Sequence, residues 1–146
     1  MSDKEYVLAR KVLRLANLII INRNADIREL GLTTEQADTL LYFSKNEGKS
    51  AADLKAHLGI THQTARGIIE RMVNKGILRT SISEKDARYR LVEVTDKGAG
   101  LCKRLKENGM HTGSRLLEGM DEEDRERFFS MIMLALENLE SMNENK

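Results

Sequence analysis

The segment of residues 51–72 constrains the fold more than any other part of this chain of 146 residues. A short helical pattern over residues 51–58 is followed by Gly59, whose backbone readily adopts the left-handed conformation. Thr61 is a typical helix-capping residue, and a second helical pattern over residues 62–75 follows it. A short glycine-containing turn sets two helices at a steep angle to each other. The segment therefore predicts a helix-turn-helix.

The second helix of this pair has two different faces. Apolar side chains recur on one face at three- and four-residue spacing and should pack inward: Ala65, Ile68, Ile69 and Met72. The opposite face carries short polar and charged groups: His62, Gln63, Arg66, Gly67 and Glu70. Such a face suits the major groove of DNA, where Arg reads guanine and Gln reads adenine. The alternative for this segment alone is an ordinary amphipathic surface helix.

A β-hairpin is predicted directly after the second helix. Two β-patterned runs, residues 78–83 and 89–95, are joined by a polar loop, and Lys85, Arg88 and Arg90 lie at or beside the tip. A hairpin next to a recognition helix forms a wing, and an arginine on a wing can enter the DNA minor groove. Phosphates would repel Asp86, so we interpret it as the carboxylate that orients Arg88. The alternative is a solvated loop pair that contributes well under about 1 kcal/mol.

Helix-capping residues mark the other predicted elements. Residues 33–36, Thr-Thr-Glu-Gln, form a capping box, and Ser50, Thr95 and Asp121 each precede a helical pattern. Further helices are expected over residues 4–28, 34–46, 96–117 and 122–142. Within the third of these, Gly109 and Gly113 favour a bend, and close contact between helices is the alternative. The chain is thus predicted to be mainly α with one small β-hairpin.

The first and last helices are apolar around more than half of their circumference. Their main stripes consist of Leu8, Val12, Leu15 and Ile19 in the first helix, and Phe128, Ile132, Leu136 and Leu139 in the last. The chain has too few other elements to cover both helices, so we expect them to form a two-fold homodimer. A monomeric helical bundle is the alternative. A two-fold dimer would place two recognition helices about 34 Å apart on a pseudo-palindromic site.

The distribution of charge also favours a nucleic-acid partner. The formal net charge is only +1, but residues 54–90 hold eight Lys and Arg against three Asp and Glu. A local excess of +5 on a nearly neutral chain suggests a footprint for an anionic surface such as double-stranded DNA. Fluctuation on solvated faces is the alternative.

The order of elements resembles that of the MarR (multiple antibiotic resistance regulator) family of winged-helix transcriptional regulators. The matching strings are Leu-Gly-Ile-Thr-x-x-Thr at 58–64, Arg-Met-Val-Asn-Lys-Gly-Ile-Leu at 71–78, Asp-x-Arg at 86–88, Leu-Val-Glu-Val-Thr-Asp-Lys-Gly at 91–98 and Gly-Leu-Thr-Thr-Glu-Gln at 31–36. The resemblance implies a winged helix-turn-helix over residues 31–98, flanked by dimerisation helices in residues 1–30 and 99–146.

The same resemblance implies roles for individual residues. Arg88, held by Asp86, would enter the minor groove, the first residues of the helix at 62–75 would read the major groove, and Thr61 and Thr64 would lie near phosphates. The implied function is a sequence-specific regulator, a repressor that binds its operator as a homodimer. The family also implies a pocket between the winged domain and the dimer helices, often filled by a small anionic aromatic ligand that releases the DNA.

Other classes of protein receive less support from the sequence. The chain contains no Gly-x-Ser-x-Gly, His-Glu-x-x-His or Cys-x-x-Cys motif, so we expect neither an enzyme nor a cofactor. The alternative function is a metal- or redox-responsive regulator of the same fold, but His57, His62, His111 and Cys102 include no pair at i, i+4 spacing. Cys102 is expected to be a buried, inert thiol. The apolar stretches are too short to cross a bilayer, and no signal peptide is recognisable. A single cysteine cannot form an internal disulfide, so we expect the protein in the reducing cytoplasm.

Overall fold

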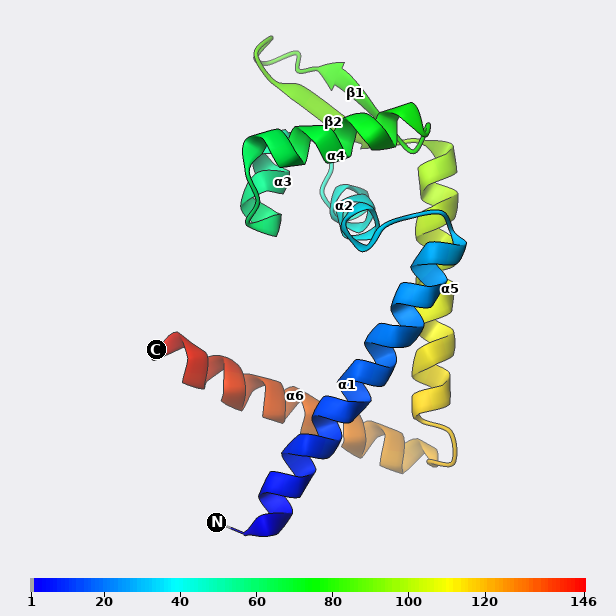
Figure 1. Ribbon diagram of the computed structural model, residues 1–146, viewed down its shortest axis with the longest axis vertical. Helices are drawn as coiled ribbons and strands as arrows, with labels where there is room; N and C mark the ends of the chain where they lie inside the picture. Colours follow the sequence, from blue (N-terminus) through cyan, green and yellow to red (C-terminus); the bar gives the residue numbers. More distant parts are fainter. Residues whose placement is uncertain (1) are drawn as a thin grey trace. The chain divides into compact units, whose positions relative to one another are not determined.

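The computed structural model describes residues 2–146, and it is mainly α-helical with one antiparallel hairpin (Figure 1). The elements in chain order are α1 (Asp3–Glu29), α2 (Thr34–Lys45), α3 (Ala51–Leu58), α4 (His62–Asn74), β1 (Leu78–Ile82), β2 (Arg90–Val94), α5 (Asp96–Leu116) and α6 (Glu122–Glu144). Every element expected from the sequence is present, and each observed end lies within two residues of the expected one. The chain divides into two compact units, one up to residue 110 and the other from residue 111 onward.

The capping residues make the local hydrogen bonds that the sequence predicts. The Thr33 hydroxyl accepts from the Gln36 amide at 3.1 Å, and the Gln36 side chain accepts from the Thr33 amide at 3.2 Å, which completes the capping box of α2. Thr61 and Asp121 accept from amides three residues ahead in the same way. These bonds satisfy amides that have no partner within the helix, and they therefore fix where α2, α4 and α6 begin.

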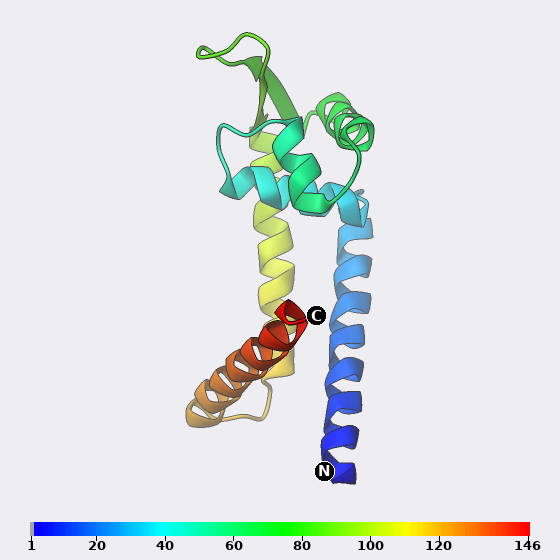
Figure 2. The same ribbon diagram turned by 90° about the vertical axis from the view of Figure 1, so that its left-hand side faces the viewer.

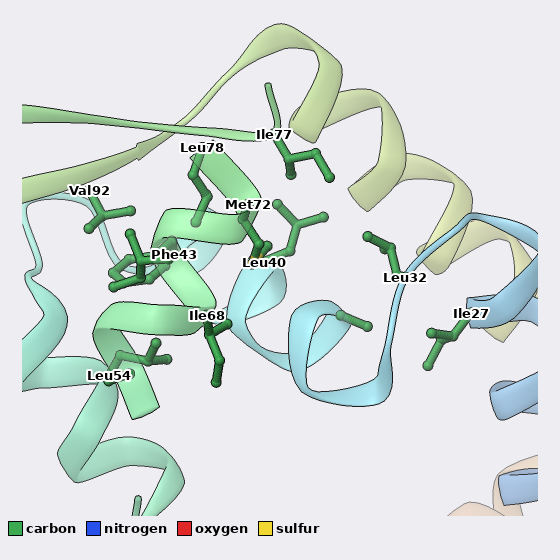
Figure 3. Packing of buried hydrophobic residues seen from close by; sticks show 13 residues of the cluster. Ile27, Leu32, Leu40, Phe43, Leu54, Ile68, Met72, Ile77, Leu78 and Val92 are labelled. Atoms are coloured by element: carbon green, nitrogen blue, oxygen red, sulfur yellow. The ribbon is translucent and has the colours of Figure 1, made fainter. Parts of the chain in front are cut away.

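One hydrophobic core lies in the first unit, among α2, α3, α4 and the hairpin (Figure 3). Leu40 of α2, Leu54 of α3 and Met72 of α4 are fully buried in it. The base of the hairpin contributes Leu78 from β1 and Val92 from β2. Helix α4 and the hairpin therefore pack against a shared apolar interior, which holds them in a defined relation to each other.

The hairpin is anchored to the start of α3 as well as to the core. Strands β1 and β2 pair in a register that places Leu78 opposite Val94 and Ile82 opposite Arg90. On the other edge of β2, the Val92 amide donates to the carbonyl oxygen of Lys49 at 2.9 Å. Figure 2 shows that the loop of the hairpin projects beyond α2, α3 and α4. The base of the hairpin is thus fixed, and its tip extends into solvent.

Gly98 is buried in the first turn of α5, next to the base of the hairpin. A Cβ atom at this position would lie 2.3 Å from the carbonyl oxygen of Ile77 and 2.8 Å from Cγ1 of Val94. Only glycine allows this close approach between α5 and the base of the hairpin.

The predicted bend at Gly109 and Gly113 does not interrupt α5. The helix runs without a break from Asp96 to Leu116, through both glycines. Neither glycine has an atom within 4 Å of the position that a Cβ would occupy. Isolated glycines weaken a helix by about 1 kcal/mol each but do not by themselves break it.

Helices α1 and α6 expose much of their apolar surface. In α1, Leu8 is 63% exposed and Ile27 is the one residue that is buried among Asp3–Glu29. No residue of α6 is buried, and Leu139 is 58% exposed. The rest of the two predicted stripes is exposed or half-buried: Val12, Leu15, Ile19, Phe128, Ile132 and Leu136. Over residues 2–146, no helix is both long enough and apolar enough to cross a bilayer.

Candidate nucleic-acid interface

Helix α4 separates its buried and exposed residues as its sequence predicts. Ala65, Ile68, Ile69 and Met72 are all at most 5% exposed and pack into the core. The opposite face is open to solvent and carries His62, Gln63, Arg66 and Glu70, with Gly67 half-buried among them. The apolar face therefore fixes the rotation of α4 about its axis, and that rotation turns the polar face outward.

The N-terminus of α4 is held by a pair of threonines. The Thr61 hydroxyl accepts from the Thr64 amide at 3.1 Å and donates to the Thr64 hydroxyl at 2.8 Å. Both residues are exposed. The partial positive charge of a helix N-terminus is favourable for a nearby anion, and these two hydroxyls lie at that end of the recognition helix.

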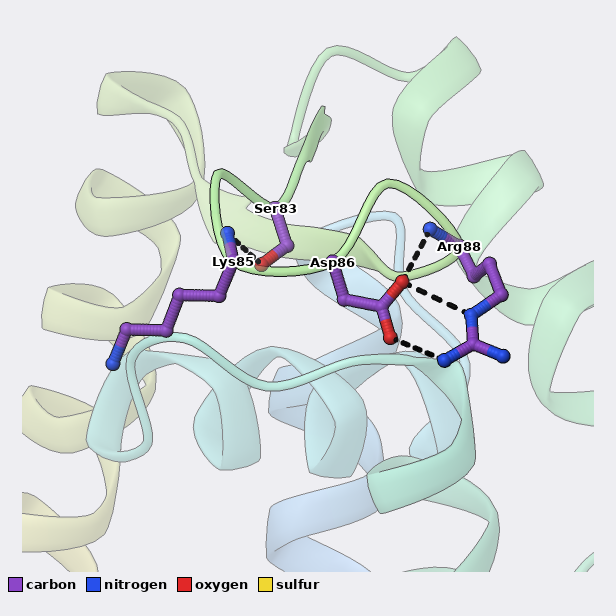
Figure 4. Close-up of polar contacts among 4 residues, drawn as sticks. All are labelled: Ser83, Lys85, Asp86 and Arg88. Atoms are coloured by element: carbon purple, nitrogen blue, oxygen red, sulfur yellow. Dashed lines mark hydrogen bonds and ion pairs between the residues drawn. The ribbon is translucent and has the colours of Figure 1, made fainter.

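Asp86 holds Arg88 at the tip of the wing (Figure 4). Nε of Arg88 donates to Oδ1 of Asp86 at 3.1 Å, and Nη2 donates to Oδ2 at 2.9 Å. The Arg88 backbone amide also donates to Oδ1, at 3.0 Å. The side chain of Arg88 is nevertheless 88% exposed. The arrangement predicted from the sequence is present: a bidentate carboxylate fixes the guanidinium and leaves it accessible to a partner.

The same contacts keep both groups charged. The hydrogen bonds from the Arg88 side chain and amide lower the pKa of Asp86 below its ordinary value. The carboxylate in turn raises the pKa of Arg88. The ion pair therefore persists at any pH near neutrality.

The other two predicted cations of the wing are exposed. Lys85 extends from the loop, where its backbone amide donates to the Ser83 hydroxyl at 3.2 Å (Figure 4). Arg90 begins β2 and lies opposite Ile82. Together with Arg88 they give the loop end of the hairpin three exposed positive charges, which suits a polyanion.

A groove of about 740 Å³ lies between α4 and the wing and reaches the first residues of α3. It brings together four of the residues predicted from the sequence, His62 and Arg66 of α4 with Arg88 and Arg90 of the hairpin. A second hollow, of about 760 Å³, follows the outer face of α4 and is lined by Gln63, Thr64 and Gly67, together with His62, Arg66, Glu70 and Arg71. The predicted residues Thr61, Lys85 and Asp86 line neither hollow.

Arg71 is a further cation of α4 that was not among the predicted site residues. Its guanidinium folds back along α4, with Nη1 3.6 Å from the position that a Cβ of Gly67 would occupy. Residues four apart on a helix are neighbours, so the spacing from Gly67 to Arg71 could have predicted that Arg71 lies over Gly67. Tyr89, Asn74 and Thr80 also line the groove beside the wing, and their positions follow from the packing of the hairpin against α4.

The His and Cys residues of the chain are not arranged as a metal or redox sensor would need. Among residues 2–146 no group of three His, Cys, Asp or Glu side chains is arranged to hold a metal ion. The ring of His57 stacks on Tyr42, with 4.4 Å between the ring centroids. Burial raises the pKa of the Cys102 thiol, which lowers the fraction of reactive thiolate. The geometry thus favours DNA binding over metal or redox sensing.

Comparisons with known proteins agree with this geometry. The family model described as "MarR family" matches residues 30–88. The HTH-type transcriptional regulator YfiV of Bacillus subtilis is 26% identical over 139 residues, which cover 91% of this chain and 83% of YfiV. The HTH-type transcriptional repressor IacR of Pseudomonas putida is 23% identical over 116 residues, which cover 80% of this chain and 70% of IacR.

Solved structures share the same fold. The structure of YusO from Bacillus subtilis matches with a TM-score of 0.82 at 15% identity and covers 94% of this chain and 98% of its own. A point mutant of S. aureus MepR bound to an oligodeoxyribonucleotide matches with a TM-score of 0.72 at 19% identity, over 92% of this chain and 97% of its own. The fold, the helix-turn-helix with its wing, and these matches lead to one conclusion: the chain has the fold of the winged-helix MarR regulators, and its residues 30–88 match the model of that DNA-binding family.

Proposed function

We propose that this protein is a repressor that binds a pseudo-palindromic operator as a homodimer. The observation that carries the proposal is the convergence of α4 and the wing on one cationic groove, in which Arg66, Arg88 and Arg90 meet. An arginine on a recognition helix can read guanine, and wing arginines suit the minor groove and the phosphates beside it. Repression agrees with the function of the relative IacR, which is a transcriptional repressor.

Each part of the interface has a proposed role. His62, Gln63, Arg66 and Gly67 would face base edges in the major groove, while the hydroxyls of Thr61 and Thr64 would contact phosphates at the N-terminus of α4. On the wing, Arg88 would enter the minor groove with its guanidinium held by Asp86, and Lys85 and Arg90 would neutralise phosphates. Arg71, which lies over Gly67, joins this set as a cation on the outer face of α4.

The proposed dimer is supported by the apolar surfaces of α1 and α6. Soluble monomers rarely expose large contiguous apolar patches, and patches of this kind usually mark protein–protein interfaces. Leu8, Val12, Leu15 and Ile19 of α1 are exposed to 38% or more, as are Leu136 and Leu139 of α6. Burying these side chains against a second copy would give a two-fold assembly with two recognition helices.

The effector and the compartment are also part of the proposal. A small anionic aromatic ligand would release the repressor by favouring a spacing of the recognition helices that does not fit the operator. The function requires no catalysis, and its partner, double-stranded DNA, makes the cytoplasm the expected place of action.

Selection of bound fragments from random DNA, followed by footprinting, tests the proposal directly. We expect an enriched inverted repeat with half-sites one duplex turn apart, protected by one dimer. Affinity should fall steeply with salt, because neutralised phosphates release counterions. Sedimentation as a single subunit without preference among duplexes at low salt would contradict the proposal. A direct repeat or an isolated half-site would contradict the two-fold arrangement alone.

A further inference from the structure

Lys75, at the C-terminal end of α4, is directed differently from the cations of residues 54–90 that we propose to bind DNA. It is one of the eight basic residues that give residues 54–90 their positive charge. Its ammonium group, however, donates to the carbonyl oxygen of Gly31 at 2.9 Å and to Oε1 of Gln36 at 3.1 Å. Both acceptors belong to the joint between α1 and α2, so two of the three ammonium protons are directed away from the wing groove.

The two acceptors are themselves held in place. Gln36 is buried, and its Oε1 also accepts from the Thr33 amide in the capping box of α2. Gly31 follows the C-terminus of α1 with a φ of +75°, and its amide donates to the carbonyl oxygen of Arg28. Lys75 therefore bonds to a rigid joint and not to a mobile surface group.

A second set of bonds holds the same end of α4 from the other side. Nζ of Lys97, in the first turn of α5, donates to the carbonyl oxygen of Lys75 at 2.8 Å. The Thr95 hydroxyl lies 2.6 Å from the carbonyl oxygen of Gly76, to which it donates. The last turn of α4 is thus tied both to the end of α1 and to the start of α5.

We propose that Lys75 is a positioning residue that fixes the angle of α4 relative to the end of α1 and thereby sets operator specificity without touching DNA. The proposal rests on the DNA-binding function proposed above. Helix α4 has 13 residues, so it is about 20 Å long at 1.5 Å per residue. A tilt of about 3° at its C-terminal end moves its N-terminal residues by about 1 Å, which is enough to disrupt hydrogen bonds to base edges.

The test compares Lys75→Met with the wild type on the selected operator and on a scrambled duplex over a range of salt concentrations. We expect operator affinity to fall about tenfold at every salt concentration, with scrambled-duplex affinity within about twofold of the wild type. The slope of log affinity against log salt should not change, because no phosphate contact is lost. Two matched charge removals serve as controls: Lys85→Met on the wing and Lys106→Met on the exposed surface of α5. Lys85→Met should reduce the slope by about 0.9, and Lys106→Met should change nothing.

Two further variants separate positioning from a purely structural role. Lys75→Arg keeps a donor and should restore most of the specificity. Gln36→Glu keeps the capping box and offers Lys75 a charged acceptor, so it should leave operator preference intact. All measurements are made at a temperature where circular dichroism shows every variant folded. A purely structural Lys75 would lower the melting temperature but leave the ratio of operator to scrambled affinity unchanged.

The outcomes are distinct. An unchanged affinity ratio for Lys75→Met overturns the proposal, and so does a salt slope that falls by about 0.9, which would place Lys75 on a phosphate. A wild type that selects no operator overturns the proposed function first, and this inference with it.

Discussion

Replacing Gly98 with alanine should destabilise the protein, although alanine is the better helix former. The Cβ of the new side chain would lie 2.3 Å from the carbonyl oxygen of Ile77. This is 0.7 Å below 3.0 Å, the shortest contact that Cβ atoms normally make. That oxygen also accepts from the Thr95 amide at 3.1 Å, so it cannot move without weakening the joint between β2 and α5. Val94 restricts the other side, with its Cγ1 2.8 Å from the added atom.

The magnitude follows from two opposing effects. Inserting a methyl group into a tightly packed site costs about 1–3 kcal/mol. Replacing glycine by alanine within a helix returns about 0.5–1 kcal/mol. A separation of 2.3 Å is a severe overlap, so the cost should lie in the upper part of its range, at about 2–3 kcal/mol. Subtracting about 1 kcal/mol for helix propensity, we expect Gly98→Ala to lower the free energy of unfolding by about 1–2 kcal/mol. At roughly 3 °C per kcal/mol for a chain of this size, the melting temperature should fall by about 3–6 °C.

Gly100→Ala is the matched control, two residues further along α5. No atom lies within 4 Å of the position of its Cβ, so only the gain in helix propensity applies. We expect it to raise the free energy of unfolding by about 0.5–1 kcal/mol. Thermal and urea unfolding of both variants measures the difference. Both are run at one fixed protein concentration, because dissociation of the proposed dimer would make the transition concentration-dependent. A Gly98→Ala protein that unfolds at or above the wild-type temperature would refute the close approach.

Four other substitutions test separate parts of the structure. Thr39→Val removes the one buried side-chain oxygen that lacks a hydrogen-bond partner among residues 2–146. The free energy of unfolding, measured by urea denaturation, should therefore stay equal or rise by up to about 1 kcal/mol; a loss above that size would mean that the hydroxyl is satisfied. Arg88→Ala should weaken operator binding at least tenfold in a gel-shift titration while sedimentation still shows a dimer; unchanged affinity at moderate salt would remove Arg88 from the interface. Arg66→Ala should relax base preference at one operator position by about 1–3 kcal/mol in competition assays, whereas a uniform loss over all sequences would assign Arg66 to a phosphate. Leu136→Glu places a charge on the exposed apolar surface of α6 and should yield monomers in sedimentation; a dimer of unchanged affinity would place the interface elsewhere.

The boundaries of the helices and strands were predictable because the interactions that set them are local. The capping box of Thr33 and Gln36 and the cap of Thr61 each span three residues. The buried face of α4 follows from the spacing of four apolar residues along a single helix. The pairing of Asp86 with Arg88 spans two residues and was predicted from charge alone. Such contacts need no knowledge of the remaining fold.

The contacts that were missed include one between segments far apart in the chain and one within a single helix. The tight packing at Gly98 could not be predicted, because Ile77, whose carbonyl oxygen it approaches, lies far away in the chain, just before β1. Glycines 109 and 113 favoured a bend in α5; the helix continues through both of them, and the bend itself stays a prediction. Arg71 was counted only as charge, although its position over Gly67 determines which surface of α4 it occupies.

By itself the sequence determined where helices begin and end, which faces are apolar, and that positive charge gathers on one quarter of the chain. The tertiary structure alone decided where each of those charges is directed. Lys75 bonds to Gly31 and Gln36, which are 44 and 39 residues away, while Arg88 remains exposed on the wing. A long flexible side chain takes its direction from the acceptors that folding brings within reach, and these cannot be read from its neighbours in sequence.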